Sequence, residues 1–200
     1  MGPGGYLSWD RTERADVAEG IVEKVARTLS VAEPTPVQLE MAAVSMIFRD
    51  PKRPAVLLIE RAERAGDPWS GQIALPGGKM RAGDGTARNA AVRETFEEVG
   101  VDLERSAEFL GYGQMATTHI GTMGVVPSIF LLRDDVTVKP NSEVASFRWI
   151  GVEELRSSKS QSSYTVKVDG KSVVMPAILV GGYLIWGLTY RIILSALWPP

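Results

Sequence analysis

Residues 71–101 read GQIALPGGKMRAGDGTARNAAVRETFEEVGV, and this stretch decides the fold. Its second half predicts a helix that carries carboxylates at Glu94, Glu97 and Glu98. Side chains three and four positions apart are neighbours on a helix, so we expect these carboxylates to share one face. The opposite face should pack against a sheet through its apolar side chains, which are Val92, Phe96 and Val99.

The clustered carboxylates predict a metal site. They repel one another, and a hard divalent cation such as Mg²⁺ or Mn²⁺, which prefers oxygen ligands, removes that repulsion. Pro76-Gly77-Gly78 precedes the helix and predicts a tight turn, from which a backbone carbonyl such as that of Gly77 could join the carboxylates around the metal. The metal would bind phosphate oxygens and lower the pKa of a bound water, which suits hydrolysis of a phosphoric anhydride.

Neighbouring residues are expected to set the ends of this helix and to orient its carboxylates. Thr86 or Asp84 can cap the N-terminus, and Gly100 occupies the usual position of a C-terminal glycine. Arg93 can reach Glu97 one turn on, or Asp84 in the preceding loop. We therefore expect Arg93 to hold a ligand carboxylate in place.

The length and composition predict one domain and argue against nucleic acid, membranes and thiolate chemistry. The chain has 200 residues, of which 44% are hydrophobic, and we expect an arm and helix over residues 1–36 and a core over residues 37–200. A net charge of −2 gives no electrostatic footprint for nucleic acid or an anionic membrane. The absence of cysteine excludes thiolate chemistry, and a single histidine argues against a zinc site. Without a signal-peptide pattern, the expected location is the cytoplasm.

Residues 176–198 are rich in apolar side chains and resemble a membrane span in length. Gly181, Gly182 and Gly187 interrupt the segment, and Arg191 lies inside it. The pattern therefore favours the end of a buried strand followed by a core helix over residues 182–197.

Periodic apolar positions predict the other elements. Residues that recur every fourth position between Val17 and Leu29 predict a helix that starts at Asp10, with Glu13 completing a capping box. A helical turn is expected over residues 152–155. Strands are expected over residues 42–48, 55–59, 71–75, 109–117, 124–132 and 146–150, with a hairpin over residues 164–168 and 172–175.

Residues 78–101 resemble the Nudix box, GX5EX7REUXEEXGU, in which U is an aliphatic residue. Asp84 stands in place of the first glutamate, one residue further from Arg93 than in the box, and Thr95 replaces an aliphatic residue. The resemblance implies an α/β/α sandwich with a mixed β-sheet, to which an N-terminal helix and a C-terminal helix are added. The residues that match the box are Arg93, Glu94, Glu97, Glu98, Gly100 and Val101.

The resemblance also implies an activity and a set of ligands. Nudix enzymes hydrolyse a nucleoside diphosphate linked to another group, so the expected partner is a small molecule. By this resemblance Glu97 and Glu98 are the principal metal ligands, and Glu94 supports them. Any of the three could instead polarise water, and the sequence does not separate base from ligand. Gly78, the first residue of the box, is a candidate for contact with the substrate.

Further segments resemble the coenzyme A pyrophosphatase branch of the family. LLIERA at residues 57–62 is similar to the motif LLTxR(S/A), and GQIALPGG at residues 71–78 is similar to GQxxFPGG. IWGLT at residues 185–189 is similar to IWGxT, and the longer loop with Asp84 is also common in that branch. The resemblance covers residues 42–197 and implies coenzyme A or an acyl derivative as the substrate.

The branch motifs are incomplete in this chain. Arg64 comes too early to stand for the second arginine of the branch, and the segment between the motifs is one residue longer. Ile59 replaces a threonine, and Leu75 replaces a phenylalanine. These departures fall in the segment that would mark coenzyme A as the substrate.

Other residues are candidates for the site. Glu143 precedes a late strand and is either a further base or ligand, or an exposed carboxylate. Arg61 and Arg64 either hold substrate phosphates, which arginine matches in geometry, or carry surface charge. His119 is expected to be structural. The tryptophans expected in the core rather than in a base-stacking site are Trp149 and Trp186.

Three functions follow from these patterns. The first is a Mg²⁺- or Mn²⁺-dependent diphosphate hydrolase that acts on coenzyme A or acyl-coenzyme A. The second is the same chemistry on ADP-ribose, on a dinucleotide such as NADH, or on a damaged nucleotide. The third is a non-catalytic nucleotide-binding module, against which the intact REXXEE sequence argues. The N-terminal and C-terminal helices could each provide the surface of a homodimer.

Overall fold

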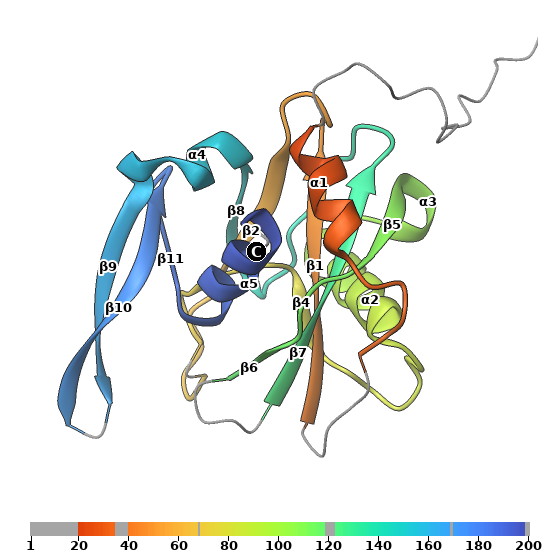
Figure 1. Ribbon diagram of the computed structural model, residues 1–200. Helices are drawn as coiled ribbons and strands as arrows, with labels where there is room; N and C mark the ends of the chain where they lie inside the picture. Colours follow the sequence, from red (N-terminus) through yellow and green to blue (C-terminus); the bar gives the residue numbers. More distant parts are fainter. Residues whose placement is uncertain (1–19, 35–39, 68, 119–122, 169, 199–200) are drawn as a thin grey trace, which may run out of the picture.

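The computed structural model describes residues 20–34, 40–67, 69–118, 123–168 and 170–198, which form two sheets and the helices around them (Figure 1). The strands of the main sheet are β1 (Glu40–Arg49), β2 (Ala55–Arg61), β3 (Ile73–Ala74), β4 (Gly77–Lys79), β5 (Ala107–Tyr112), β6 (Ala116–Thr117), β7 (Met123–Leu132) and β8 (Val144–Gly151). Those of the second sheet are β9 (Gln161–Val168), β10 (Lys171–Val180) and β11 (Tyr183–Trp186). The α-helices are α1 (Ile21–Thr28), α2 (Ala87–Val99), α3 (Leu103–Ser106), α4 (Val152–Arg156) and α5 (Gly187–Leu197), and a 3₁₀ turn covers Ser158–Ser160.

The main sheet is mixed, as the sequence predicts. β1 runs parallel to β7, from the pair Glu40–Met123 to the pair Phe48–Leu131, and antiparallel to β2 and β4. The order along the sheet is β3-β2-β1-β7-β5, while β8 pairs with β2 and β6 pairs with β7. The antiparallel pairing of β1 with β2 confirms the hairpin expected from residues 42–48 and 55–59.

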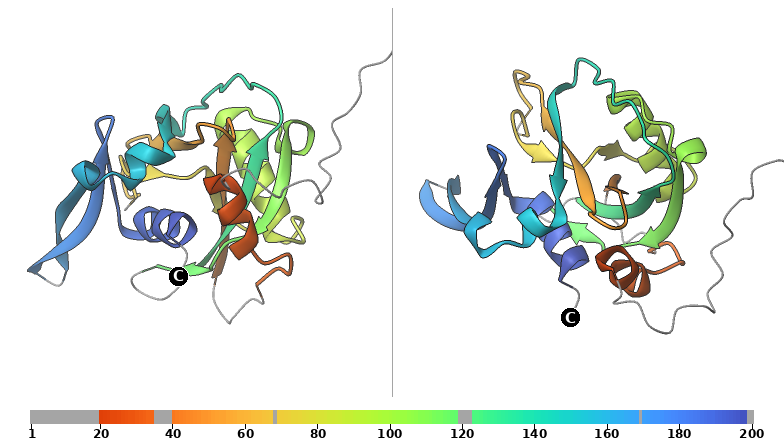
Figure 2. Two further views of the ribbon diagram at one scale, coloured as in Figure 1. Left: turned by 45° about the horizontal axis from the view of Figure 1, so that its top comes forward. Right: turned by 90° about the horizontal axis from the view of Figure 1, so that it is seen from above.

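Helices cover both faces of the main sheet because alternate residues of β1 point to opposite sides. Ala43 and Ile47 belong to a core that they share with α2 and α3. Met46 and Phe48 belong to a second core, which contains residues of α1 and α5. The result is the expected α/β/α sandwich, with α2 behind the sheet and with α1 and α5 in front of it in Figure 1 (Figures 1 and 2).

The helices near the two ends of the described chain are seen from Ile21 and from Gly187. The first is seen from Ile21, after Gly20 in an extended conformation, and the predicted start at Asp10 lies outside the described residues. Val22 and Val25 of α1 are buried, which agrees with a helix packed on the outside of the domain.

The prediction of a helix from residue 182 is wrong, because Tyr183–Trp186 forms β11 instead and α5 begins at Gly187. Gly181 and Gly182 both have positive φ, 57° and 83°, and connect β10 to β11 as a two-residue hairpin turn. The backbone of residues 183–186 is therefore satisfied by β10 and not by a helix. No helix among the described residues has the length and apolar character needed to cross a membrane.

Candidate functional site

The helix α2 carries the predicted carboxylates and has the expected ends. Thr86 is the N-cap, and its side chain accepts a hydrogen bond of 3.1 Å from the N–H of Asn89. Gly100 ends the helix with a φ of 68°, and its N–H donates to the carbonyl of Phe96. The helix therefore presents residues 93–98 from a fixed register, with both ends satisfied.

The buried face of α2 differs from the predicted one. Phe96 is 57% exposed, whereas Thr95 is fully buried and its hydroxyl donates a hydrogen bond of 2.7 Å to Ser45 Oγ. Ser45 in turn donates to the carbonyl of Ala91. Small residues and this pair of hydroxyls bring the helix close to β1. The aliphatic residue that the Nudix box has at position 95 is thus replaced by a hydrogen-bonded one.

The orientation of α2 that buries Thr95 also buries Glu98. Its carboxyl group accepts a hydrogen bond of 2.9 Å from the N–H of Gly77, and its exposed fraction is only 3%. Burial, together with the charges of Glu94 and Glu143, raises the pKa of Glu98 to about 7, although the Gly77 N–H and Arg61 act in the opposite direction. A buried carboxylate among other carboxylates is the arrangement that a bound cation stabilises.

The segment Pro76-Gly77-Gly78 is not the tight turn that its sequence indicates. Gly77 and Gly78 lie in β4 and pair with Val44 and Ala43 of β1, and the carbonyl of Pro76 accepts a hydrogen bond from the N–H of Ser45. Gly77 has a φ of 155°, and a Cβ atom there would lie 2.3 Å from the carbonyl oxygen of Ala43. Only glycine allows this close approach, which aims the Gly77 N–H at Glu98.

Gly78 has a second role next to Glu94. A Cβ atom at Gly78 would lie 2.7 Å from the carboxyl carbon of Glu94, so glycine leaves the space that this carboxylate occupies. Glu94 also accepts a hydrogen bond of 2.6 Å from Arg93 Nη1. The carboxylates of Glu94 and Glu98 are thereby set on the same side of α2, one turn apart.

Arg93 is held by Asp84, the residue at which the chain departs from the Nudix box. Its Nε and Nη2 atoms lie 2.7 and 2.9 Å from the two oxygens of Asp84, and its Nη2 also donates to the carbonyl of Lys79. The hydrogen bonds from Arg93 lower the pKa of Asp84 to about 2. Asp84 therefore anchors the arginine that contacts Glu94.

Glu97 lies on the exposed side of α2, where it pairs with Arg81 and Arg93. Its side chain is exposed and forms two hydrogen bonds of 3.2 Å with Arg81, while Arg93 Nη1 lies 3.4 Å away. In the part of the chain that the structure describes, no three Asp, Glu or His side chains come together in a way that could hold a metal ion. Glu97 and Glu94 share both arginines, since Arg93 Nη1 also contacts Glu94 and Arg81 Nη2 lies 3.8 Å from Glu94. The role of Glu97 as a metal ligand stays a prediction.

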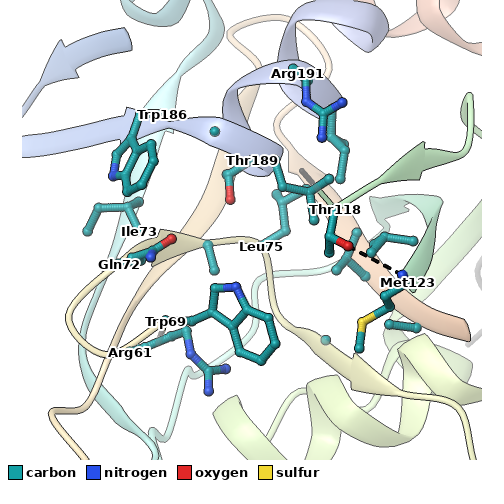
Figure 3. Close-up of a pocket in the computed structure, with 18 of the residues that line it drawn as sticks. Arg61, Trp69, Gln72, Ile73, Leu75, Thr118, Met123, Trp186, Thr189 and Arg191 are labelled. Carbon is teal, nitrogen blue, oxygen red and sulfur yellow. Dashed lines mark hydrogen bonds between the residues drawn. The ribbon is translucent and has the colours of Figure 1, made fainter. Parts of the chain in front are cut away.

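A cavity of about 710 Å³ opens beside Glu94 and Glu98 (Figure 3). Arg61 and Trp69 line one side of it, and Trp186, Thr189 and Arg191 line the other. Gly77, Gly78 and Glu143 also line it. Most of its remaining wall is apolar and comes from β3, β7, β9, β10 and α5.

The two candidate arginines have different places. Arg61 lines the cavity and forms an ion pair of 2.8 Å with Asp67, and its buried Nε has no hydrogen-bond partner. Arg64 is absent from the cavity wall and forms an ion pair of 3.1 Å with Glu143. The structure therefore leaves Arg61 available to a ligand and uses Arg64 to hold Glu143.

Some residues of the cavity were not predicted from the sequence. Trp186 lines the cavity instead of the core, and its ring stacks on that of Tyr164 with centroids 4.6 Å apart. Trp69 lies in the loop before β3, and the aromatic residue itself was the only signal for it. Trp149 does pack against the core as expected, whereas His119 lies outside the described residues.

A model of the NUDIX domain matches residues 39–168, which include the β4–α2 unit, the two cavity carboxylates and Glu143. The chain belongs to the Nudix family. Nudix hydrolases generally use divalent metal ions, and the donor atoms that Glu94 and Glu98 bring to the cavity are the hard oxygens that such ions prefer.

The curated relatives match parts of this Nudix chain. A putative 8-oxo-dGTP diphosphatase of Mycobacterium tuberculosis is 35% identical over 56% of this chain and 53% of its own length. The peroxisomal coenzyme A diphosphatase ndx-8 of Caenorhabditis elegans is 32% identical over 48% of this chain and 42% of its own length. An uncharacterized protein of Schizosaccharomyces pombe is 37% identical over 51% of this chain and 33% of its own length. The matches thus span about half or less of these relatives.

Solved structures show the same Nudix fold. A MutT/nudix family protein from Enterococcus faecalis superposes with a TM-score of 0.54 and 19% identity, over 82% of this chain and 63% of that protein. At this identity the likeness concerns the fold alone.

Proposed function

We propose that this Nudix protein hydrolyses a diphosphate bond in a nucleoside diphosphate derivative with the help of Mg²⁺ or Mn²⁺. The observation that carries the proposal is the buried carboxylate of Glu98, which faces the cavity beside Glu94 and is aligned by the N–H of Gly77. A charged group kept in such a place lowers stability unless a cation compensates it. Selection for function explains its presence better than selection for stability.

The residues of the chain have distinct roles in this proposal. Glu94 and Glu98 would hold the metal together with the carbonyl of Gly77, and Arg93 positions Glu94. The metal supplies charge for the phosphate oxygens and a water of lowered pKa. Glu97 would join only after separating from Arg81, and its exposed position permits that movement.

Glu143 and Arg61 are proposed to act on the other reactants. Glu143 lines the cavity and is a candidate base for the attacking water, held by Arg64. Arg61 is proposed to bind a substrate phosphate, because its guanidinium group lines the cavity and matches the geometry of phosphate. Gly78 lines the cavity and is proposed to contact the substrate through its backbone, beside the Glu94 carboxylate.

Coenzyme A or acyl-coenzyme A is the favoured substrate. Trp186 and Thr189 of the IWGLT motif and Arg61 of the LLIERA motif all line the cavity, although they come from distant parts of the chain. The likeness to a coenzyme A diphosphatase supports the same substrate. The likeness to a putative 8-oxo-dGTP diphosphatase favours a damaged nucleotide instead, and ADP-ribose and NADH stay as further alternatives.

The test is a panel of substrates with Mg²⁺ and with Mn²⁺, in which the products are separated by mass. The panel contains coenzyme A, acetyl-coenzyme A, ADP-ribose, NADH and 8-oxo-dGTP, and Glu98→Gln provides the inactive control. We expect coenzyme A to be split into an adenosine bisphosphate and a phosphopantetheine. Preference for another diphosphate would keep the chemistry and change the substrate. Binding of nucleotides without any cleavage would instead favour the non-catalytic module.

A further inference from the structure

We propose that the β9–β10 hairpin binds an aliphatic chain carried by the substrate. This inference rests on the proposed hydrolysis of a nucleoside diphosphate derivative. It adds which part of the substrate the hairpin recognises. The cavity lined by Glu94 and Glu98 is also lined by Val173 and Met175 of β10. A substrate whose diphosphate lies at the carboxylates can therefore extend its attached group toward the hairpin.

The cavity side of the hairpin is an apolar wall, which consists of Val166, Val168, Val173 and Met175. Val166 lies opposite Val173, and Met175 lies opposite Tyr164, so these side chains share one face of the two strands. The ring of Tyr164 stacks on Trp186, which also lines the cavity. The apolar wall is thus joined to the body of the domain through an aromatic pair.

The rest of this part of the cavity suits the same ligand. Leu75, Met123 and Leu188 also line the cavity as a whole, and Gln72 and Ile73 lie between Trp186 and Trp69 in Figure 3. Methionine side chains at two places, Met123 and Met175, can adapt to a flexible chain. An extended hydrocarbon is therefore a better match than a rigid, polar group.

Charge argues against a second phosphate at the hairpin. Among the described hairpin residues that line the cavity, only Lys167 is charged. The hairpin also extends away from the main sheet, as Figures 1 and 2 show, and Val173 on its cavity side is 38% exposed, so apolar surface there is open to a ligand. The continuity with the carboxylates makes that ligand part of the substrate.

The first experiment compares coenzyme A with its octanoyl thioester. Each methylene moved from water to an apolar site favours binding by about fourfold, so partial burial of the chain should raise kcat/KM by about tenfold or more. The same preference should appear in binding to Glu98→Gln, measured by calorimetry, because that measurement does not depend on turnover. Equal kcat/KM and equal affinity for the two compounds would overturn the inference.

Two matched variants locate the effect. Val173 lines the cavity, whereas its neighbour Val174 points to the other side of the strand and is 66% exposed. Val173→Ser should lower the ratio of octanoyl to free coenzyme A, in kcat/KM and in affinity, by about threefold to tenfold, and Val174→Ser should leave it unchanged. Equal effects of the two variants would place the chain elsewhere.

The outcomes separate this inference from the proposed function. If neither compound is cleaved but octanoyl-coenzyme A still binds more tightly in a way that needs Val173, the hairpin inference stands and the proposed reaction fails. If both are cleaved equally, the reaction stands and the inference fails. A change from dimer to monomer in Val173→Ser, seen by light scattering, would assign the apolar wall to a second copy of the chain and overturn the inference.

Discussion

At the scale of single residues, Glu98 brings function and stability into conflict. Without a metal its buried carboxylate is destabilising at pH 8, because its pKa lies at about 7 instead of 4.5. Glu98→Gln keeps an acceptor for the Gly77 N–H and removes the charge. We expect it to raise the free energy of unfolding by about 1–3 kcal/mol and to lower turnover by orders of magnitude.

Urea denaturation in the presence of a chelator measures the stability part of this prediction. Glu97→Gln serves as the control, because Glu97 is exposed and its ion pair with Arg81 contributes at most about 1 kcal/mol. A less stable Glu98→Gln protein would mean that the native carboxylate is already compensated by its protein neighbours.

The charge of Asp84 stabilises the folded state, whereas that of Glu98 destabilises it, because the pKa of Asp84 is lowered and that of Glu98 is raised. Its pKa lies at about 2, below the ordinary value of 3.8, so its charge stabilises the folded state above about pH 4 and this contribution is lost as pH falls to 2. Asp84→Asn should lower the free energy of unfolding at pH 7 by about 1–3 kcal/mol. The difference from the wild type should shrink between pH 4 and 2 in denaturation measured at each pH. A difference that persists at pH 2 would assign it to packing and not to charge.

The identities of most site residues could be predicted from the sequence, but not all of their positions. Helical spacing identified Glu94 and Glu98, and the Asp84–Arg93 contact was among the alternatives. Helical spacing failed for Phe96, which is exposed, because an angle of some tens of degrees about the helix axis decides which side chains face the sheet. That angle depends on the Thr95–Ser45 hydrogen bond, which joins residues 50 positions apart.

At the scale of elements, the two glycines of β4 allow this strand to lie close both to β1 and to α2. Gly77→Ala would place a Cβ atom 2.3 Å from a backbone oxygen of β1, at a φ of 155°. We expect it to lower the free energy of unfolding by about 3 kcal/mol or more, and to move the N–H away from Glu98. Thermal unfolding and activity at saturating metal both measure the effect.

Gly83→Ala is the matched control for Gly77→Ala. Gly83 lies in the loop between β4 and α2, where an added Cβ would meet no atom within 4 Å. This substitution should change stability by less than about 0.5 kcal/mol and leave activity unaltered. Equal effects at the two glycines would show that the close approach of β4 to β1 is unimportant.

The elements with strong local signals were predicted, and those that depend on distant pairing were not. The strands β1, β2 and β7 carry long apolar runs, and these strands and β8 were expected close to their observed bounds. The turn expected at Pro76-Gly77-Gly78 became a strand because β1 offers it hydrogen-bond partners. The Gly181-Gly182 pair did carry a hairpin signal, but the apolar run around it also fits a helix.

At the scale of the whole molecule, the cavity could not be predicted, because it is assembled by the topology. β1 and β7 are neighbours in the sheet although about 80 residues separate them, and residues of β3, β10 and α5 line the same cavity as residues of these two strands. The sequence motifs identify Arg61, Glu98 and Trp186 one by one. Only the fold brings them to the same space, where a phosphate-binding group, a metal-binding group and an aromatic ring can act on one substrate.

This arrangement predicts different roles for two arginines that are only three residues apart. Arg61→Ala should raise KM for the diphosphate substrate by about tenfold, because it removes a charged donor from the cavity wall. Arg64→Ala should change KM by less than about twofold, because Arg64 lies outside the cavity and contacts Glu143. Steady-state kinetics at a saturating metal concentration give both values.

Asp67→Asn tests whether Arg61 acts directly. Arg61 also pairs with Asp67, in the loop that carries Trp69, so its loss could raise KM by loosening that loop. Asp67→Asn weakens the same pair and leaves the guanidinium in the cavity. KM should then stay close to that of the wild type or fall, since the arginine is freed for phosphate. If Asp67→Asn raises KM as much as Arg61→Ala does, Arg61 supports the loop and does not bind the substrate.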